Sequence, residues 1–266
     1  MVRGPRKHLK RLAAPKSWLL DLKKGVFAPR PSTGPHHFSE CIPLSLLLTD
    51  KLGYSRNNKE TCHILKEKMV LINGRVRKDP RFPVGLFDVL SIPKANEHYR
   101  ILYNVAGRFI LYPISEEQAK FKLTTVRKTI IGKKNIPMVY TVDGGSFMFC
   151  DQDIIAGDTV KVDLKTGRII EHVHLEVGHP ALIKKGKNMG CVGTITHIEK
   201  KGQNEFVVKL KDLKDRVFAT RRCNLVMIGK DGKTWIDLPE EKGVKLNVLE
   251  QSNLKYEGTI VSAEEQ

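Results

Sequence analysis

Apolar positions recur at helical spacing in two stretches that follow an N-terminal region without such a pattern. In the first stretch, Leu44, Leu47 and Leu48 lie at positions i, i+3 and i+4, and Gly53 is placed to end the helix. The second stretch, residues 57–69, begins with an Asn followed three residues later by a Glu, which is an N-cap pattern, and continues with an apolar stripe. The pattern predicts two consecutive helices.

A short hairpin is predicted directly after the second helix. Asn73 and Gly74 separate two apolar runs, and this dipeptide between such runs is the strongest short-range hairpin signal. Cations follow the turn and also form a separate stripe on the second helix. We therefore expect residues 42–95 to form a helix–helix–hairpin unit whose basic surface suits the minor groove of an RNA helix. An ordinary solvated helix face is the alternative for the helical stripe.

Alternating apolar and polar positions predict strands throughout residues 96–177. The expected strands are residues 100–103, 108–112, 124–131, 138–142, 158–164 and 169–175. Residues 101–177 carry ten Lys or Arg against nine Asp or Glu, so a mixed, mainly-β central domain used for geometry or protein contact is predicted. His172 and His174 form a pair, but no third ligand lies at close spacing, so no metal site is expected.

Five further short strands are predicted within residues 178–230, at 181–183, 192–198, 206–210, 216–220 and 225–228. Five short strands with turn-rich links are typical of a small barrel. The first link contains Lys184, Lys185 and Lys187 beside three glycines, which favour close approach of a phosphate backbone. The spacing is not that of a nucleotide P-loop. A plain hairpin turn is the alternative.

Residues 1–41 contain five of the thirteen prolines and no apolar pattern long enough to pack alone. We expect a basic extended arm that orders on a partner. Its cations would neutralise phosphates, and its aromatic side chains would stack on an unpaired base or wedge into a neighbouring protein. For Trp18, packing onto the globular part of this chain is an equally weighted alternative.

The distribution of charge along the chain gives information about its binding partner. The chain has a formal net charge of +17, concentrated as +7 in residues 1–40, +5 in residues 41–100 and +8 in residues 178–230. Separate basic blocks of this kind indicate a polyanionic partner, which in cells is most often nucleic acid. No apolar run approaches the ~18 residues of a membrane span, and no signal peptide is expected. Five widely spaced cysteines without a C-x-x-C pair indicate a reducing compartment.

Two N-terminal motifs carry a family resemblance. The run from Arg3 to Arg11 and the run from Gly25 to Pro35 closely resemble the small-subunit ribosomal protein family "S-four" of the eukaryotic and archaeal type. Residues 42–95 are similar to the RNA-binding module named after that family, and residues 178–211 resemble a KOW motif. The resemblance implies a structural component of the 40S ribosomal subunit that binds and stabilises small-subunit rRNA, without catalysis or a cofactor.

The sequence thus predicts an α+β, multi-domain chain: an arm (1–41), the RNA-binding module (42–95), the central domain (96–177), a KOW-type small β-barrel (178–230) and a C-terminal extension with an acidic tail (231–266). The expected RNA-binding residues are Arg3, Arg6, Lys7, His8, Lys10, Arg11, Lys16, Arg30, Arg56, Lys59, Lys66, Asn73, Arg75, Arg77, Lys78, Lys184, Lys185, Lys187, Asn188, Arg221 and Arg222.

The resemblance also implies partners and a location. The expected partners are small-subunit rRNA and neighbouring small-subunit ribosomal proteins, with no membrane and no small-molecule substrate. The expected location is the cytoplasmic ribosome, with a nucleolar stage during assembly. Two alternatives use the same modules: an RNA-modifying enzyme, for which no framed catalytic carboxylate is found, and a KOW transcription elongation factor.

Overall fold

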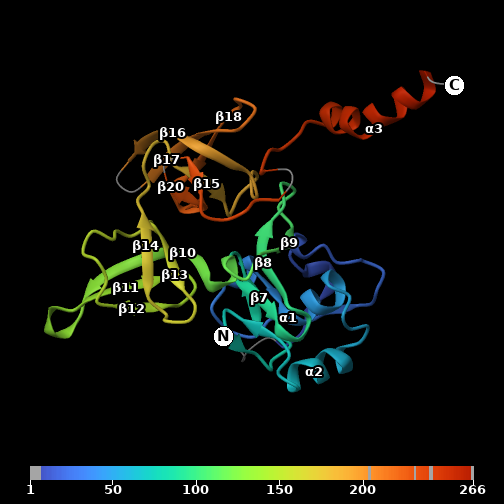
Figure 1. Cartoon of the computed structure of the whole chain (residues 1–266), viewed down its shortest axis with the longest axis horizontal. Helices are drawn as coiled ribbons and strands as arrows, with labels where there is room; N and C mark the ends of the chain where they lie inside the picture. The colour runs from blue at the N-terminus through green and yellow to red at the C-terminus, as the bar shows by residue number, and fades with distance from the viewer. Residues whose placement is uncertain (1–6, 203–204, 231, 240–241, 265–266) are drawn as a thin grey trace, which may run out of the picture.

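The computed structural model describes residues 7–202, 205–230, 232–239 and 242–264. Its body contains three five-stranded antiparallel sheets, and short helices lie beside the first of them (Figure 1). The protein is therefore mixed α and β with a majority of strands, as the sequence predicts.

The first sheet has the strand order β5–β4–β7–β8–β9. Its strands are β4 (Leu71–Ile72), β5 (Arg75–Val76), β7 (Val89–Ile92), β8 (Glu97–Tyr103) and β9 (Phe109–Pro113). The sheet crosses the domain boundary expected at residue 95, because β8 pairs with β7, with Arg100 opposite Val89. Burial explains this correction: Ile101 and Phe109 complete the core of the first unit, which residues before 95 cannot close alone.

Both expected helices are present beside this sheet. The elements are β3 (Cys41–Pro43), α1 (Leu44–Leu46), its π-helical continuation (Leu47–Lys51), α2 (Asn58–Lys66) and β6 (Pro83–Gly85), which pairs with β3. The Leu52 N–H donates to the Leu47 carbonyl at 3.0 Å, five residues back, which defines the π turn. Asn57 is the N-cap residue of α2, and the Glu60 carboxylate accepts the Arg56 N–H at 2.8 Å.

The second sheet has the order β12–β11–β10–β13–β14. Its strands are β10 (Phe121–Ile131), β11 (Pro137–Thr141), β12 (Ser146–Met148), β13 (Thr159–Asp163) and β14 (Ile169–Val173). Four of them match predicted strands, and β12 was not predicted. A separate small core of Val126, Val139, Ile154 and Val160 lies within this unit.

The third sheet has the order β18–β17–β16–β15–β19. Its strands are β15 (Pro180–Ile183), β16 (Val192–Lys201), β17 (Glu205–Lys211), β18 (Val217–Arg221) and β19 (Leu225–Met227). All five begin within one residue of the predicted starts. In the described residues β18 and β19 are the two edges of the sheet and do not pair, so no closing strand ladder completes a barrel.

The N-terminal segment is folded against this chain, whereas the prediction was an extended arm that orders on a partner. The alternative given for Trp18, packing onto the globular part of this chain, is confirmed. β1 (Leu9–Lys10) pairs with β2 (Phe27–Ala28), and short 3₁₀ turns follow at Arg11–Ala13, Lys16–Trp18 and Phe38–Glu40. Trp18 is 1% exposed, lies in the core of the first unit, and donates its indole N–H to the Cys41 carbonyl at 2.6 Å. Burial of so large an aromatic group supplies the apolar anchor that local patterning did not reveal. Residues 1–6 lie outside the described part of the chain.

The C-terminal extension contains a small hairpin and one helix. The hairpin strands are β20 (Gly229–Lys230) and β21 (Lys233–Thr234), and the helix is α3 (Val248–Glu264). α3 projects away from the three sheets (Figure 1). Near its start, Glu250 forms an ion pair with Arg216 and lies 3.5 Å from the Lys214 ammonium, so the helix is tethered at one end.

The three sheets meet in a shared apolar core. Leu102 comes from the first sheet, Leu123 from the second, and Leu182 and Val226 from the third, and all four are buried together with Phe87. Removing this much apolar surface from water holds the sheets against one another. The basic segments therefore have fixed relative positions.

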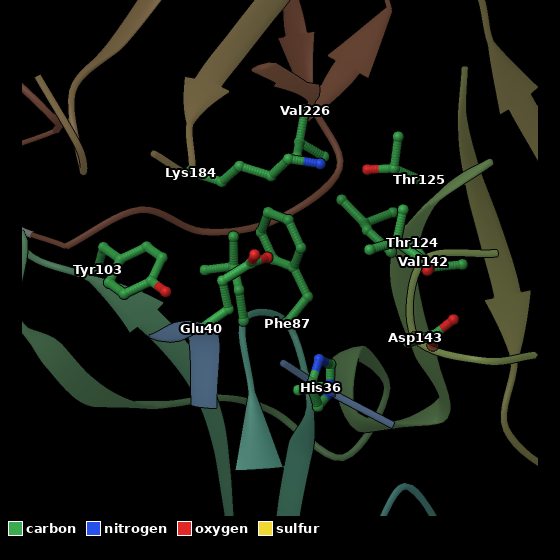
Figure 2. Close-up of a pocket in the computed structure, with 12 residues that line it drawn as sticks. His36, Glu40, Phe87, Tyr103, Thr124, Thr125, Val142, Asp143, Lys184 and Val226 are labelled. Atoms are coloured by element: carbon green, nitrogen blue, oxygen red, sulfur yellow. The ribbon is translucent and has the colours of Figure 1, made fainter. Parts of the chain in front are cut away.

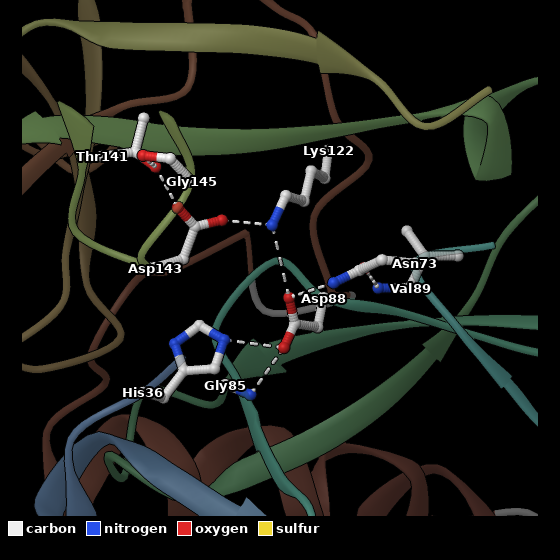
Figure 3. A network of polar contacts seen from close by, with 9 residues as sticks. All are labelled: His36, Asn73, Gly85, Asp88, Val89, Lys122, Thr141, Asp143 and Gly145. Atoms are coloured by element: carbon white, nitrogen blue, oxygen red, sulfur yellow. Dashed lines mark hydrogen bonds and ion pairs between the residues drawn. The ribbon is translucent and has the colours of Figure 1, made fainter. Parts of the chain in front are cut away.

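A buried polar network reinforces this junction (Figure 3). The Asp88 carboxylate is 2% exposed and accepts hydrogen bonds from His36 Nε2 at 2.7 Å and from the Gly85 N–H at 2.9 Å. Lys122 of β10 forms an ion pair with Asp143 and lies 3.9 Å from Asp88. The network thus joins the N-terminal segment, the first unit and the second sheet.

The charges in this network stabilise one another. Burial opposes ionisation of Asp88, but the His36 and Lys122 charges outweigh burial and lower its pKa. Burial also disfavours charged His36, and the facing Asp88 carboxylate reverses this and raises the His36 pKa. Burial likewise disfavours ionised Asp143, whose pKa is lowered by Lys122. The geometry therefore favours the ionised forms.

We expect Trp18→Ala to destabilise the chain by about 3–5 kcal/mol, because it empties a buried aromatic site and removes a hydrogen bond. Chemical denaturation measures this loss. Leu12→Ala is the matched control in the same segment, since Leu12 is 83% exposed and its removal should change the free energy of unfolding by less than about 0.5 kcal/mol. Equal effects of the two variants would restore the free-arm interpretation.

Asp88→Asn should cost about 3–5 kcal/mol near neutral pH, because it leaves buried cations without their counterion. Because the pKa of Asp88 is lowered in the folded protein, its contribution to stability is present above pH ~4 and is lost as the pH falls through that lowered pKa. Because the pKa of His36 is raised in the folded protein, its contribution to stability is present below pH ~6.5 and is lost as the pH rises through that raised pKa. Unfolding measured across pH should therefore show the largest difference from wild type between these limits. A pH-independent difference would contradict the charged network.

Candidate nucleic-acid interface

The hairpin and α2 present a group of exposed cations. Asn73 and Gly74 adopt positive φ angles of 51° and 73°, the backbone that a tight two-residue turn requires. The exposed predicted cations of this unit are Arg56, Lys59, Lys66, Arg75 and Lys78. Within the described residues, none of these side chains forms an ion pair or a hydrogen bond. They are therefore available for phosphate groups.

Two other predicted contacts of this unit are used inside the protein. The Asn73 amide donates to Asp88 at 2.7 Å and accepts the Val89 N–H at 2.9 Å, so both of its ends are occupied. The Arg77 guanidinium lies over the Phe82 ring at 4.4 Å. The Asn73 amide therefore stabilises the hairpin, and it is not expected to contact RNA as predicted from the sequence. The Arg77 guanidinium can contact RNA only through the side that faces away from the Phe82 ring.

The predicted RNA-binding residues of the N-terminal segment also fall into two groups, those that are exposed and those that are bonded within the protein. Lys7, His8, Lys10 and Lys16 are exposed, whereas Arg11 donates to the Asp21 carbonyl at 3.0 Å. Arg30 donates to the His8 carbonyl at 3.4 Å and lies 5.6 Å from the Phe38 ring. The two arginines stabilise the folded segment, and the lysines and His8 remain at the surface. Arg3 and Arg6 lie outside the described residues.

The glycines after β15 do not form the expected ligand cradle. A side chain at Gly190 would meet the Asn104 carbonyl at 2.0 Å, so the close backbone approach there is to the β8–β9 turn of the same chain. Gly193 lies within β16, where a side chain would meet the Lys211 carbonyl at 2.7 Å. These two glycines therefore allow two segments of the chain to pack closely together. The spacing of glycines in the sequence does not distinguish this role from close approach to a ligand.

The lysines of this loop have different surroundings. Lys185 forms an ion pair with Glu40 at 2.5 Å, which joins the loop to the N-terminal segment. Lys187 is exposed, and Asn188 is half-buried. Lys184 is also half-buried, and burial lowers the pKa of its ammonium despite the nearby Glu40 carboxylate.

The two arginines at the end of β18 also differ. Arg221 is exposed and makes no contact with a described side chain, whereas Arg222 donates to the Ala156 carbonyl at 2.8 Å and lies 5.3 Å from the Phe206 ring. Gly157 leaves room for Arg222, since a side chain there would come within 2.7 Å of the guanidinium. Arg222 therefore joins the third sheet to the second, while Arg221 is exposed.

A cleft of about 560 Å³ lies where these segments meet. It is lined by Arg221, Arg222 and Lys184 from the third sheet and by Arg127 from β10. Sequence reasoning missed Arg127, because the central region has almost no net charge. The adjacent Arg127-Lys128 pair on a strand was the available local signal.

A smaller cavity of about 50 Å³ adjoins the cleft at the junction of the three sheets (Figure 2). Lys184, Thr125 and Val142 line both spaces. In the part of the chain that the structure describes, no group of three or more His, Cys, Asp or Glu side chains is arranged to hold a metal ion. No described helix is long and apolar enough to span a membrane.

Comparison with known proteins shows the family to which this chain belongs. The RS4NT (NUC023) domain model matches residues 3–39, the model of ribosomal family S4e matches residues 95–169, and the model of the 40S ribosomal protein S4 C-terminus matches residues 212–258. Small ribosomal subunit protein eS4A of Schizosaccharomyces pombe is 43% identical over 251 residues, which cover 94% of this chain and 96% of that protein. This chain belongs to the S4e family of ribosomal proteins.

Further members of the S4e family support the assignment. Small ribosomal subunit protein eS4 of Spodoptera frugiperda is 43% identical over 251 residues, covering 94% of this chain and 95% of its own. The crystal structure of the 30S ribosomal protein S4e from Thermoplasma acidophilum has a TM-score of 0.63 at 28% identity, covering 74% of this chain and 99% of its own. The resemblance seen in the sequence motifs is thus confirmed, and it extends to the fold.

The neighbouring arginines at the end of β18 offer a matched test of these assignments. Arg222→Ala should reduce the free energy of unfolding by about 1–3 kcal/mol, because it removes a hydrogen bond to the second unit and a ring contact within the third sheet. Arg221→Ala should change it by less than about 0.5 kcal/mol. Denaturant unfolding of both variants measures the difference. Similar values would mean that Arg222 is not a link between the sheets.

Proposed function

We propose that this S4e-family chain is a structural constituent of the small ribosomal subunit that binds and stabilises small-subunit rRNA. The observation that carries the proposal is the relation, over nearly the whole length, to proteins named as small-ribosomal-subunit constituents. The net charge of +17 and the exposed cations support contact with a polyanion. Cytoplasmic ribosomes would be its main location, with assembly in the nucleolus.

The proposed mechanism is simultaneous contact at several fixed places. Three groups of exposed cations take part: one in the N-terminal segment (Lys7, Lys10 and Lys16), one on the hairpin unit (Lys59, Arg75 and Lys78) and one around the third sheet (Lys187 and Arg221). Each group alone would bind RNA weakly, at roughly 10⁻⁴–10⁻⁶ M by comparison with basic DNA-binding proteins. Because one folded chain carries all three groups, the affinity for RNA would rise ~10²–10⁴-fold when all of them contact the RNA together.

The finer assignments belong to the same proposal. We take residues 42–113 as the RNA-binding module, with the boundary moved to include β8 and β9, and β15–β19 as the KOW-type unit. The second sheet would contact neighbouring small-subunit proteins, because Ile131, Met148 and Phe149 are exposed on it at 73%, 61% and 78%. Apolar side chains at that exposure favour a protein neighbour over a phosphate backbone.

The hairpin group gives a direct test. The triple variant Lys59→Ala, Arg75→Ala and Lys78→Ala should bind small-subunit rRNA more weakly, and the slope of log affinity against log salt should become less steep by about 2–3, because three phosphate contacts are lost. Filter binding over a salt series measures both values. Because all three side chains are exposed, folding should be unaffected.

A charge-matched control separates specific contacts from net charge. The triple variant Lys94→Ala, Lys120→Ala and Lys165→Ala removes the same charge from exposed positions outside the three groups and should keep a slope nearer that of wild type. Equal loss in both triple variants would remove the support for fixed contact sites. Failure of the wild-type protein to sediment with small subunits would overturn the proposed function itself.

A further inference from the structure

The cleft between the second and third sheets differs in the charge of its lining from four other hollows of the described structure. Its lining contains four cations, Arg127, Lys184, Arg221 and Arg222, and no Asp or Glu among the described residues. Each of four further hollows includes at least one carboxylate in its lining. Four positive side chains around one hollow whose lining contains no carboxylate favour an anionic occupant.

Two polar side chains, Lys184 and Thr125, line both the cleft and the smaller cavity that adjoins it. Figure 2 shows the Lys184 ammonium and the Thr125 hydroxyl approaching one another from the third and second sheets. Neither side chain forms a hydrogen bond or an ion pair with another described residue. Glu40 pairs with Lys185 and acts on the Lys184 charge only from a longer distance. A half-buried ammonium in such a place gains from a bound acceptor.

The remaining lining is apolar. Val126 and Leu225 are buried, Val207 and Phe206 are partly buried, and Val142 lies at the edge, 42% exposed. A hollow of about 560 Å³ with an apolar wall and a few polar groups has the size and character of a small-ligand site. Inorganic phosphate alone would leave this wall uncovered, whereas a nucleotide carries both an anion and a flat apolar ring.

Arg222 links the two sides of the cleft. Arg222 is fixed by the Ala156 carbonyl and the Phe206 ring, so it joins the two walls as well as contributing charge. Arg127 and Arg221 are exposed at the rim, one on each sheet. A backbone phosphate between these two would be neutralised from both sides, and the attached base would reach the apolar wall.

We propose that this cleft receives one unstacked nucleotide of the bound RNA, with its phosphate between Arg127 and Arg221. Its base would lie against the accessible apolar lining formed by Val142, Phe206 and Val207, where Thr125 and Lys184 meet the edge of the base. The inference rests on the proposed function and adds to it a defined single-nucleotide contact. Reading of unstacked bases is a common mode of RNA recognition.

The experiment uses the full-length chain and adenosine 5′-monophosphate as the probe, observed by saturation-transfer NMR. Saturation of the adenine protons is expected with wild type. Ala156→Trp should abolish it, because the indole fills the hollow while all four cations remain. The matched control is Ala106→Trp, which adds the same group at an exposed position of the β8–β9 turn and should leave the signal intact.

Further variants separate the base from the phosphate. Arg221→Ala should weaken binding of the probe about tenfold, and Lys165→Ala, an exposed cation elsewhere, should leave it unchanged. Ribose 5-phosphate, which lacks the base, should halve the adenine signal only at about ten times the concentration of the probe. Halving of the signal by ribose 5-phosphate at the same concentration as the probe would overturn the nucleotide assignment in favour of a simple anion site.

The outcomes for this inference and for the proposed function are distinguishable. No adenine signal with wild type, or an unchanged signal in Ala156→Trp, overturns the nucleotide cleft while salt-dependent binding of small-subunit rRNA still upholds the proposed function. Absence of that rRNA binding overturns the proposed function whatever the mononucleotide does. Unfolding midpoints of the two Trp variants that match wild type establish that any loss of signal comes from the filled cleft.

Discussion

A carboxylate that has no access to water must be neutralised by the groups around it, and in this protein those groups come from different parts of the chain. Asp88 receives His36 from the N-terminal segment, Asn73 from the hairpin and Lys122 from the second sheet. Removing any one of these partners leaves a buried charge partly uncompensated. The relative orientation of the segments is therefore set by electrostatics as well as by the apolar junction.

This constraint explains how a protein with so many cations keeps a definite surface. Several arginines are used inside the structure: Arg11, Arg30 and Arg222 each donate to a carbonyl of the same chain. The lysines are mostly left outside. The division follows chemistry, since the planar guanidinium with five donors suits carbonyl and ring contacts, whereas the compact ammonium stays hydrated. The exposed charges are thus a subset selected by the fold.

Local patterning predicted most elements and few of the contacts between them. The strands β15–β19, the helix α2 and the Asn-Gly hairpin follow from spacing and turn chemistry, which are short-range properties. The docking of Trp18 does not, because it depends on a partner core that begins more than twenty residues later in the chain. The same limit applies to the candidate site: Lys59 and Arg75 are exposed as expected, whereas the Asn73 amide is occupied internally by Asp88, a contact between positions fifteen residues apart.

The continuity of the first sheet across residue 95 has a consequence for biosynthesis. β7 is an inner strand whose neighbour β8 is made after it, so the nascent chain exposes an unpaired strand edge until residues 97–113 have left the exit tunnel. Such an edge is a template for pairing with other chains. During translation of this segment the newly made polypeptide therefore carries an edge that a chaperone would protect.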